Sequence, residues 1–255
     1  MGILNVTPDS FYDGGRFKNE TSILNQVEQM LTEGATFIDV GAYSSRPGAD
    51  HVGEAEELNR IIPIVEVLIK QFPEIILSID TFKSGVAKHC IEAGAAIIND
   101  ISAGHLDEKM METVGKLQVP YVMMHMKGTP KTMQQHTDYN DLLKDIIYYF
   151  SERIAEARTH KIVDVIIDPG FGFAKTMKQS YELLSHLDLL NMIEKPILVG
   201  MSRKSMIYKL LDSTPEHALN GTSSLNTVAL LKGAKILRVH DVKEAMECVT
   251  LINQL

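Results

Sequence analysis

The stretch Val165 to Phe173, VIIDPGFGF, decides the fold. An apolar run suited to a fully buried strand leads straight into Asp168. The Pro169-Gly170 pair and Gly172 then stop the strand and prevent a helix from following. A carboxylate is therefore placed at the C-terminal end of a strand, on a turn with almost no side chains. By itself Asp168 could equally cap that turn, but the same design recurs along the chain and favours a site.

The length and composition fit a single soluble domain. The chain has 255 residues, of which 45% are hydrophobic and 23% charged, as is ordinary for globular proteins. A (β/α)8 barrel needs about 250 residues, so we expect one domain over residues 1–255. The first expected strand starts at Gly2, which leaves open whether an element precedes it.

Several features of the sequence predict a cytoplasmic protein. No apolar run reaches the roughly 18 residues of a membrane span, and the first residues show no signal peptide. Cys90 and Cys248 lie far apart in helical patterns, and we expect them to be buried thiols. The formal net charge of −8 argues against nucleic-acid binding, although a local cluster of cations could still hold a phosphorylated small molecule.

Short apolar runs recur along the chain, and most of them end in a polar residue. Their content of Ile, Val and Leu is typical of parallel strands buried on both faces. We expect strands at Gly2–Val6, Thr36–Gly41, Ile75–Asp80, Ala96–Asp100, Pro120–His125, Val163–Asp168, Pro196–Met201 and Lys235–His240.

Amphipathic segments with helical spacing lie between these runs. We expect helices at Ser22–Glu33, Glu54–Gln71, Ser84–Ala93, Glu108–Leu117, Tyr139–His160, Lys178–Leu190, Ser205–Lys232 in at least two pieces, and Val242–Gln254.

Strand followed by helix, eight times over, predicts a parallel (β/α)8 barrel. Gly34, Gly94 and Gly233 sit where helices stop and mark the helix-to-strand turns. An open doubly wound sheet is the alternative, but no GxGxxG follows the first strand to support it. Since the C-terminal strand ends of a barrel meet at one mouth, we expect a single active-site constellation there: Asn5, Asp80, Asn99, Asp168, Lys204, Arg238 and His240.

The chain resembles the dihydropteroate synthase family over its whole length. The resemblance rests on ordered motifs: NVTPDSFYDGG at 5–15, SSRPG at 44–48, SID at 78–80, IND at 98–100, DPGFGFAK at 168–175, GMSRKS at 200–205, and NGTSSLN leading into RVHDV at 238–242. The family is a (β/α)8 barrel of transferases. It joins 6-hydroxymethyl-7,8-dihydropterin pyrophosphate to p-aminobenzoate, releasing pyrophosphate and making 7,8-dihydropteroate for folate biosynthesis.

The resemblance implies that Asp80, Asn99 and Asp168 hold the aminopyrimidinone edge of a pterin. Buried acceptor groups suit the donors of that edge. Lys204 is similar to the family lysine that bonds the pterin carbonyl and faces the reacting centre. Taken alone, each of Asp80, Asn99 and Asp168 is also compatible with a simple strand-end turn, and a lysine that starts a helix is usually solvated.

A pyrophosphate needs positive charge and amides. Arg238 and His240 have one residue between them, so on an extended strand both point the same way, into the expected mouth. His240 as a structural strand-end histidine is the alternative. The resemblance implies that Asn5 binds the Mg2+ ion held by the pyrophosphate. Because one amide oxygen is a weak metal site, we expect the other ligands of the ion to be substrate oxygens and water.

Two polar segments, 7–15 and 44–52, predict mobile loops after the first two strands, able to exclude water once substrate is present. The resemblance implies a p-aminobenzoate pocket made of Phe11, Ser45, Arg46, Pro47, Phe173 and Ser205. It also implies that Asp13 orders the closed loops. Ser45 stands where most family members carry Thr, which removes a methyl contact worth on the order of 1 kcal/mol or less.

The expected mechanism assigns catalysis to Lys204, Arg238, His240 and Asp168 without a nucleophilic side chain. The resemblance also implies a homodimer and a target of sulfonamides. Two other functions are compatible with a pterin-binding barrel. One is transfer of a methyl group from methyltetrahydrofolate to a corrinoid partner, which would not need SSRPG, SRKS or RVHDV. The other is a catalytically silent pterin-binding module.

Overall fold

The computed structural model describes residues 1–6, 16–43 and 52–255. Within these residues eight parallel strands follow one another in the order of the sequence. The strands are β1 Gly2–Asn5, β2 Ile38–Gly41, β3 Leu77–Asp80, β4 Ile97–Asp100, β5 Tyr121–Met124, β6 Val165–Asp168, β7 Ile197–Val199 and β8 Ala234–Leu237.

The sheet closes on itself because the segment after β8 pairs with β1. Val239 forms a parallel bridge with Gly2, the Ile3 N–H donates to the Val239 carbonyl at 2.9 Å, and the Val239 N–H donates to the Met1 carbonyl at 2.9 Å. The predicted (β/α)8 barrel is therefore confirmed.

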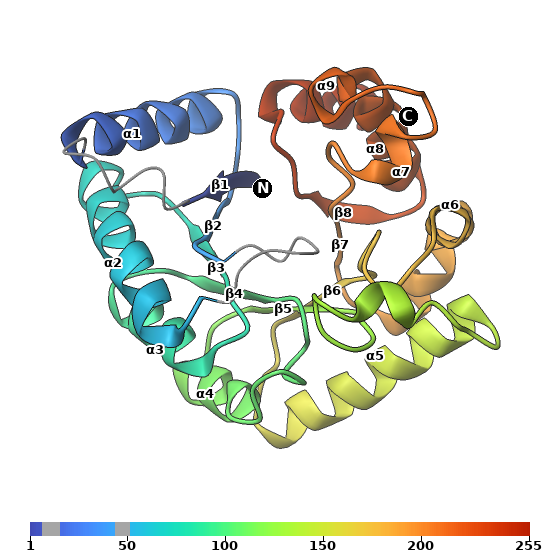
Figure 1. Cartoon of the computed structure of the whole chain (residues 1–255), viewed down its shortest axis with the longest axis horizontal. Helices are drawn as coiled ribbons and strands as arrows, with labels where there is room; N and C mark the ends of the chain where they lie inside the picture. Colours follow the sequence, from blue (N-terminus) through green and yellow to red (C-terminus); the bar gives the residue numbers. More distant parts are fainter. Residues whose placement is uncertain (7–15, 44–51) are drawn as a thin grey trace.

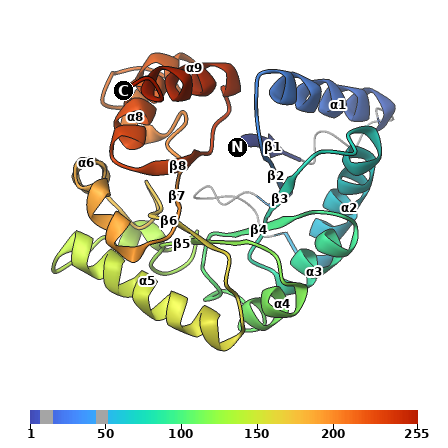
Figure 2. The ribbon, with the colours of Figure 1, turned by 180° about the vertical axis from the view of Figure 1, so that it is seen from behind.

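Helices surround the strands as an outer ring, seen from one end in Figure 1 and from the other in Figure 2. The α-helices are α1 Arg16–Thr32, α2 Glu54–Gln71, α3 Ser84–Glu92, α4 Met110–Leu117, α5 Leu142–Thr159, α6 Met177–Ser185, α7 Ser205–Tyr208, α8 Leu219–Leu231 and α9 Val242–Ile252. Short 3-10 helices lie between them: η2 Met133–Gln135, η3 Leu187–Ile193 and η4 Pro215–His217.

The boundaries of most elements differ from the sequence predictions, and the first helix begins at Arg16 rather than at Ser22. The helix predicted at 178–190 is two elements, α6 and η3, because the chain leaves the α conformation at His186 (φ −121°, ψ 23°). The segment predicted at 205–232 breaks into α7, η4 and α8. The last strand was predicted to reach His240 but ends at Leu237; beyond it the Arg238 N–H still donates to the Val199 carbonyl at 2.9 Å, and Val239 forms an isolated bridge with Gly2.

Turn glycines shape the N-terminal end of the barrel as predicted. Gly34, Gly94 and Gly233 have φ values of 100°, 110° and 101°, a region that side chains with a Cβ rarely adopt. Each follows a helix and leads the chain back toward the next strand. Among the described residues none of the helices combines the length and the apolar character that a membrane crossing demands.

Candidate active site

Alternation along the strands separates two kinds of residue. Residues on the outer face of the sheet, such as Ile79 and Ile167, pack into the large apolar layer between strands and helices. The inner face begins with apolar residues near the N-terminal strand ends, where Ile97, Val122 and Leu198 form the floor of the barrel. Two residues further along a strand the same face is reached again, so position 99 lies above Ile97 and faces into the barrel.

The polar layer above this floor is joined by hydrogen bonds between β2, β3, β4 and the segment that follows β8. Asp39 from the middle of β2 is fully buried and accepts a bond from the Ser78 hydroxyl at 2.5 Å. It also accepts one from the Asn99 amide at 3.1 Å. Arg238, just past β8, donates from Nε to Asp39 at 2.6 Å and from a terminal nitrogen to Asp80 at 2.7 Å.

Charge within this layer is balanced through Arg238. Its guanidinium lies between Asp39 and Asp80, which raise its pKa above the ordinary value. Burial raises the pKa of Asp80 to about 7, against the opposing effect of Arg238, and the Asp39 charge raises it further. Asp80 is therefore a carboxyl of this cluster that changes its protonation near neutral pH.

Asp168 ends β6 and is held by the turn that follows it. The Gly170 N–H donates to its carboxylate at 2.8 Å, while the His125 N–H donates to its carbonyl oxygen at 2.8 Å. Gly170 has a φ of 70°, and a Cβ there would lie 2.1 Å from the His125 carbonyl oxygen, so only glycine fits. Burial raises the pKa of Asp168, and the nearby Lys204 charge opposes that shift.

Lys204 lies directly before α7 and points back over the turn after β6. Its Nζ donates to the Phe171 carbonyl at 2.6 Å and lies 4.8 Å from the centre of the Phe173 ring. Burial lowers the pKa of Lys204 to about 8, while the Asp168 charge acts in the opposite direction. The structure thus brings together six of the predicted residues, namely Asp80, Asn99, Asp168, Phe173, Lys204 and Arg238.

The remaining predicted residues of the described part lie at the rim. Asn5 ends β1 and is exposed, and Ser205, also exposed, starts α7. His240 is exposed past β8, with its Nδ1 3.2 Å from the Ser202 hydroxyl. The predictions for Phe11, Asp13, Ser45, Arg46, Pro47 and the two mobile loops fall outside the described residues.

Metal binding was predicted at Asn5. Among the residues that the structure describes, no group of three His, Cys, Asp or Glu side chains could hold a metal ion. Asn5 offers one amide oxygen at the rim, which suits an ion whose other ligands come from a bound diphosphate and water. The donor set therefore fits Mg2+ only as a partner of substrate.

Sequence reasoning left three buried polar residues of this region out of the site: Asp39, His125 and Lys175. Asp39 carried a signal, because a carboxylate in the middle of a fully apolar strand requires a cationic partner, which the structure shows to be Arg238. Asp100 differs: it faces outward, where it accepts bonds from the Tyr121 hydroxyl at 2.6 Å and the Ser102 hydroxyl at 2.7 Å.

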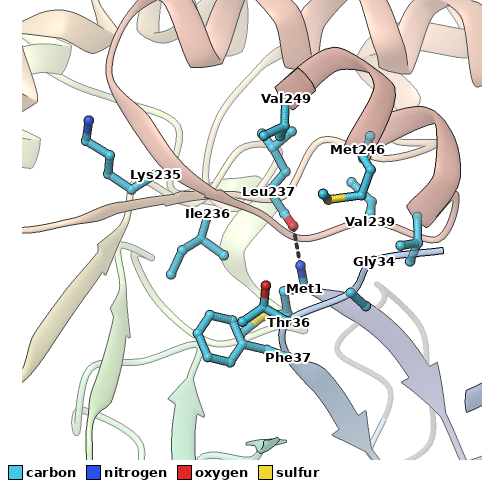
Figure 3. Close-up of a pocket in the computed structure, with 13 residues that line it drawn as sticks. Met1, Gly34, Thr36, Phe37, Lys235, Ile236, Leu237, Val239, Met246 and Val249 are labelled. Atoms are coloured by element: carbon cyan, nitrogen blue, oxygen red, sulfur yellow. Dashed lines mark hydrogen bonds between the residues drawn. The ribbon is translucent and has the colours of Figure 1, made fainter. Parts of the chain in front are cut away.

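A separate cavity of about 180 Å3 lies at the opposite end of the barrel, between the start of β8 and α9 (Figure 3). Its lining is mainly apolar and includes Phe37, Ile236 and Met246. The Met1 ammonium donates to the Leu237 carbonyl at 3.0 Å beside it. No cluster of charges faces this cavity from its lining residues, so the polar mouth is the candidate active site.

Comparison with known proteins agrees with this geometry. Residues 1–240 match the family of pterin-binding enzymes. The dihydropteroate synthase of Escherichia coli (strain K12) is 43% identical over 255 residues, covering 99% of this chain and 89% of the relative. The chain therefore belongs to the pterin-binding enzymes and, within them, to the dihydropteroate synthases, which are transferases.

Solved structures show the same fold. The Yersinia pestis dihydropteroate synthase with a sulfonamide drug complex is 44% identical, with a TM-score of 0.93 and coverage of 100% of this chain and 92% of that one. The Xanthomonas albilineans dihydropteroate synthase with 4-aminobenzoic acid is 38% identical, with a TM-score of 0.91 and coverage of 100% and 91%.

Proposed function

We propose that the polar mouth of the barrel condenses 6-hydroxymethyl-7,8-dihydropterin pyrophosphate with p-aminobenzoate to give 7,8-dihydropteroate and pyrophosphate. The observation that carries the proposal is the layer of Asp80, Asn99 and Asp168, with the Lys204 ammonium above it. A pterin edge presents several N–H donors and one carbonyl acceptor. Buried carboxylates accept from the donors, and the lysine donates to the carbonyl.

The diphosphate end of the substrate belongs at the cationic side of the mouth. Arg238 uses two nitrogens for Asp39 and Asp80, so it offers charge and its other terminal nitrogen. His240 and Asn5 complete the rim from the two strands that close the barrel. Asn5 would hold Mg2+ together with the diphosphate. Such an ion would neutralise part of the negative charge of the departing pyrophosphate.

The second substrate belongs against Phe173 and Ser205. The Phe173 ring is half-buried and provides an apolar surface for an aromatic ring, and the Ser205 hydroxyl suits a carboxylate. Phe11, Ser45, Arg46 and Pro47 as further pocket residues, and Asp13 as the residue that orders the loops, stay predictions. A family member with 4-aminobenzoic acid supports a pocket of this kind.

The chemical step exchanges one bond for another at the methylene carbon of the pterin. The carbon–oxygen bond breaks and its electron pair leaves with pyrophosphate, while the nitrogen lone pair of the arylamine forms the new carbon–nitrogen bond. The proton lost by that nitrogen passes to solvent. Arg238, His240 and Lys204 stabilise the departing negative charge, and Asp168 holds the conjugated pterin in which positive charge develops.

The test is release of pyrophosphate by the purified protein. We expect release only when the pterin pyrophosphate and p-aminobenzoate are both present, and inhibition by a sulfonamide that competes with p-aminobenzoate. Pterin binding without pyrophosphate release would contradict the synthase and leave a binding module. Methyl transfer from methyltetrahydrofolate to a corrinoid would indicate the other barrel function.

We also propose that the protein is a homodimer, located in the cytoplasm, with residues 1–255 forming one domain. Leu231 on α8 and Leu251 on α9 are 60% and 69% exposed, which supports a contact between copies over these helices. Light scattering combined with size-exclusion chromatography tests the dimer. A monomer at micromolar concentration would contradict it.

A further inference from the structure

Lys175 is a buried lysine that the proposed mechanism does not use. Its side chain is nearly inaccessible at 3% exposure. The ammonium donates to the His125 Nδ1 at 2.9 Å, to the Gly170 carbonyl at 3.1 Å and to the Phe173 carbonyl at 3.1 Å. All three acceptors are uncharged, so the ammonium has no carboxylate among its hydrogen-bond partners to offset the cost of burying a charge.

These bonds join the two ends of the turn that carries the site. Gly170 receives Lys175 on its carbonyl oxygen while its N–H donates to the Asp168 carboxylate. Phe173, near the other end of the turn, receives the same ammonium on its carbonyl oxygen. Between them the Phe171 carbonyl is bonded by Lys204. Two lysines therefore hold the backbone of one short turn.

His125 ties this arrangement to the neighbouring strand. Its N–H bonds the Asp168 carbonyl, and its Nδ1 accepts from Lys175, which requires the neutral imidazole. Burial and the Lys175 charge both lower the pKa of His125 well below its usual value. Below the Lys175 pKa of about 7, the single positive charge of this pair therefore belongs to Lys175.

We propose that Lys175 is a positioning residue for Asp168: its ammonium fixes the turn 168–175, directs the Asp168 carboxylate into the barrel mouth and places a positive charge beneath that turn. The inference deepens the proposed function and rests on the assignment of Asp168 to the pterin.

The charges around Lys175 agree with this role. Asp168 raises the pKa of Lys175, whereas burial lowers it to about 7. In return, the Lys175 charge is one of the influences that lower the pKa of Asp168 against the effect of burial. The titratable or charged groups that face the lysine and its histidine partner are Asp168, Lys204, Lys127, Tyr139 and Tyr149.

The experiment measures binding of 6-hydroxymethylpterin by calorimetry between pH 4 and pH 8. This probe lacks the diphosphate, so the pH dependence reports on the protein pocket. The variant K175M keeps the length of the side chain but removes its charge and its donors. Lys178, exposed on α6 and three residues away, provides the matched control K178M.

We expect the affinity of the wild-type protein to fall as Asp168 takes up a proton at low pH. In K175M the midpoint of this fall moves to higher pH by about one unit, because an opposite charge nearby typically lowers a carboxyl pKa by that amount or more. At pH 6, where Lys175 with its pKa of about 7 is mostly charged, the affinity of K175M is lower by about tenfold, as expected from lost hydrogen bonds to a charged group. K178M behaves as wild type.

An unmoved midpoint in folded K175M overturns the proposal, whatever the affinity, because a merely structural lysine would not change the protonation of Asp168. If K175M does not fold, K175Q keeps amide donors without the charge and must show the same shift. Failure of both variants to fold also overturns the proposal, since Lys175 would then serve the fold alone. Failure of the proposed function is distinguished by the wild type, which would release no pyrophosphate.

Discussion

The N-terminal end of the barrel is built from apolar side chains and turn glycines, whereas the C-terminal end holds charged groups inside the sheet. At the first end, Ile97, Val122 and Leu198 pack together as a floor, and Gly94 turns the chain without a Cβ. At the second end, Arg238 is bonded to two carboxylates. The apolar end therefore stabilises the barrel, whereas the polar end carries buried charges that lower its stability and that the proposed reaction needs.

The largest expected effect is on turnover, at Lys204. Lys204→Ala removes the cation over the turn after β6, and we expect the rate of pyrophosphate release to fall by about 100- to 1,000-fold, as when a preorganised donor is lost. The unfolding free energy should change little, because the removed ammonium was itself costly to bury. Lys209→Ala removes an exposed lysine just past α7 and should leave both quantities unchanged. Near-normal turnover in Lys204→Ala would contradict the assignment of catalysis to the C-terminal end of the barrel.

The next effect combines activity and stability, at Arg238. Arg238→Met leaves Asp39 and Asp80 without their cation, and removal of one partner of a buried ion pair costs about 3 kcal/mol or more. Denaturant unfolding at pH 7 measures this loss. The loss should shrink at pH 5, where the Asp80 carboxyl is protonated. A variant as stable as the wild type at pH 7 would show that the cluster does not depend on Arg238.

A smaller effect concerns pH and Asp80. The folded-state pKa of Asp80 is about 7, above that of an unfolded carboxyl near 4. The folded protein therefore binds this proton more tightly, and the contribution of Asp80 to stability falls as the pH rises from about 4 to 7. Asp80→Asn removes this titration, so the difference in unfolding free energy between wild type and variant should depend on pH in that window. A difference in unfolding free energy that does not change with pH would contradict the raised pKa of Asp80.

The smallest effect compares one glycine from each end. Gly94 and Gly172 have φ values of 110° and 78°, so alanine at either position strains the backbone by about 1 kcal/mol. Thermal unfolding should show similar losses for Gly94→Ala and Gly172→Ala. Turnover should fall only in Gly172→Ala, because this residue lies in the turn between Asp168 and Lys175. Equal turnover in the two variants would contradict the assignment of catalysis to the C-terminal end of the barrel alone.

The sequence was sufficient for the fold because its signals are local. Buried strands, helix-ending glycines and the turn after Asp168 each follow from a few neighbouring residues, and all appear in the structure. Strand ends were less certain: the last strand stops at Leu237, where its register with β7 ends, although Val239 beyond it still bridges Gly2.

The site was predicted less fully because its partners come from distant strands. Asp80, Asn99 and Asp168 could be found at strand ends, but the hydrogen bonds of Asp39 to Ser78, Asn99 and Arg238 depend on three-dimensional register. Lys175 was visible in the DPGFGFAK motif, yet nothing in the order of residues shows that its side chain folds back onto Gly170. Spacing predicts which strand bears a residue but not which partner its side chain meets.

The pairing of Gly2 with Val239 has a consequence for synthesis. A ribosome that adds about 5 to 20 residues per second releases these two partners roughly ten to fifty seconds apart. Once β2 has also emerged, β1 can pair with it on one edge, but the backbone of its other edge has no strand partner until the end of the chain is made. Because such long-range pairings are also slow to form, that edge is open to pairing with other chains until the last strand has emerged.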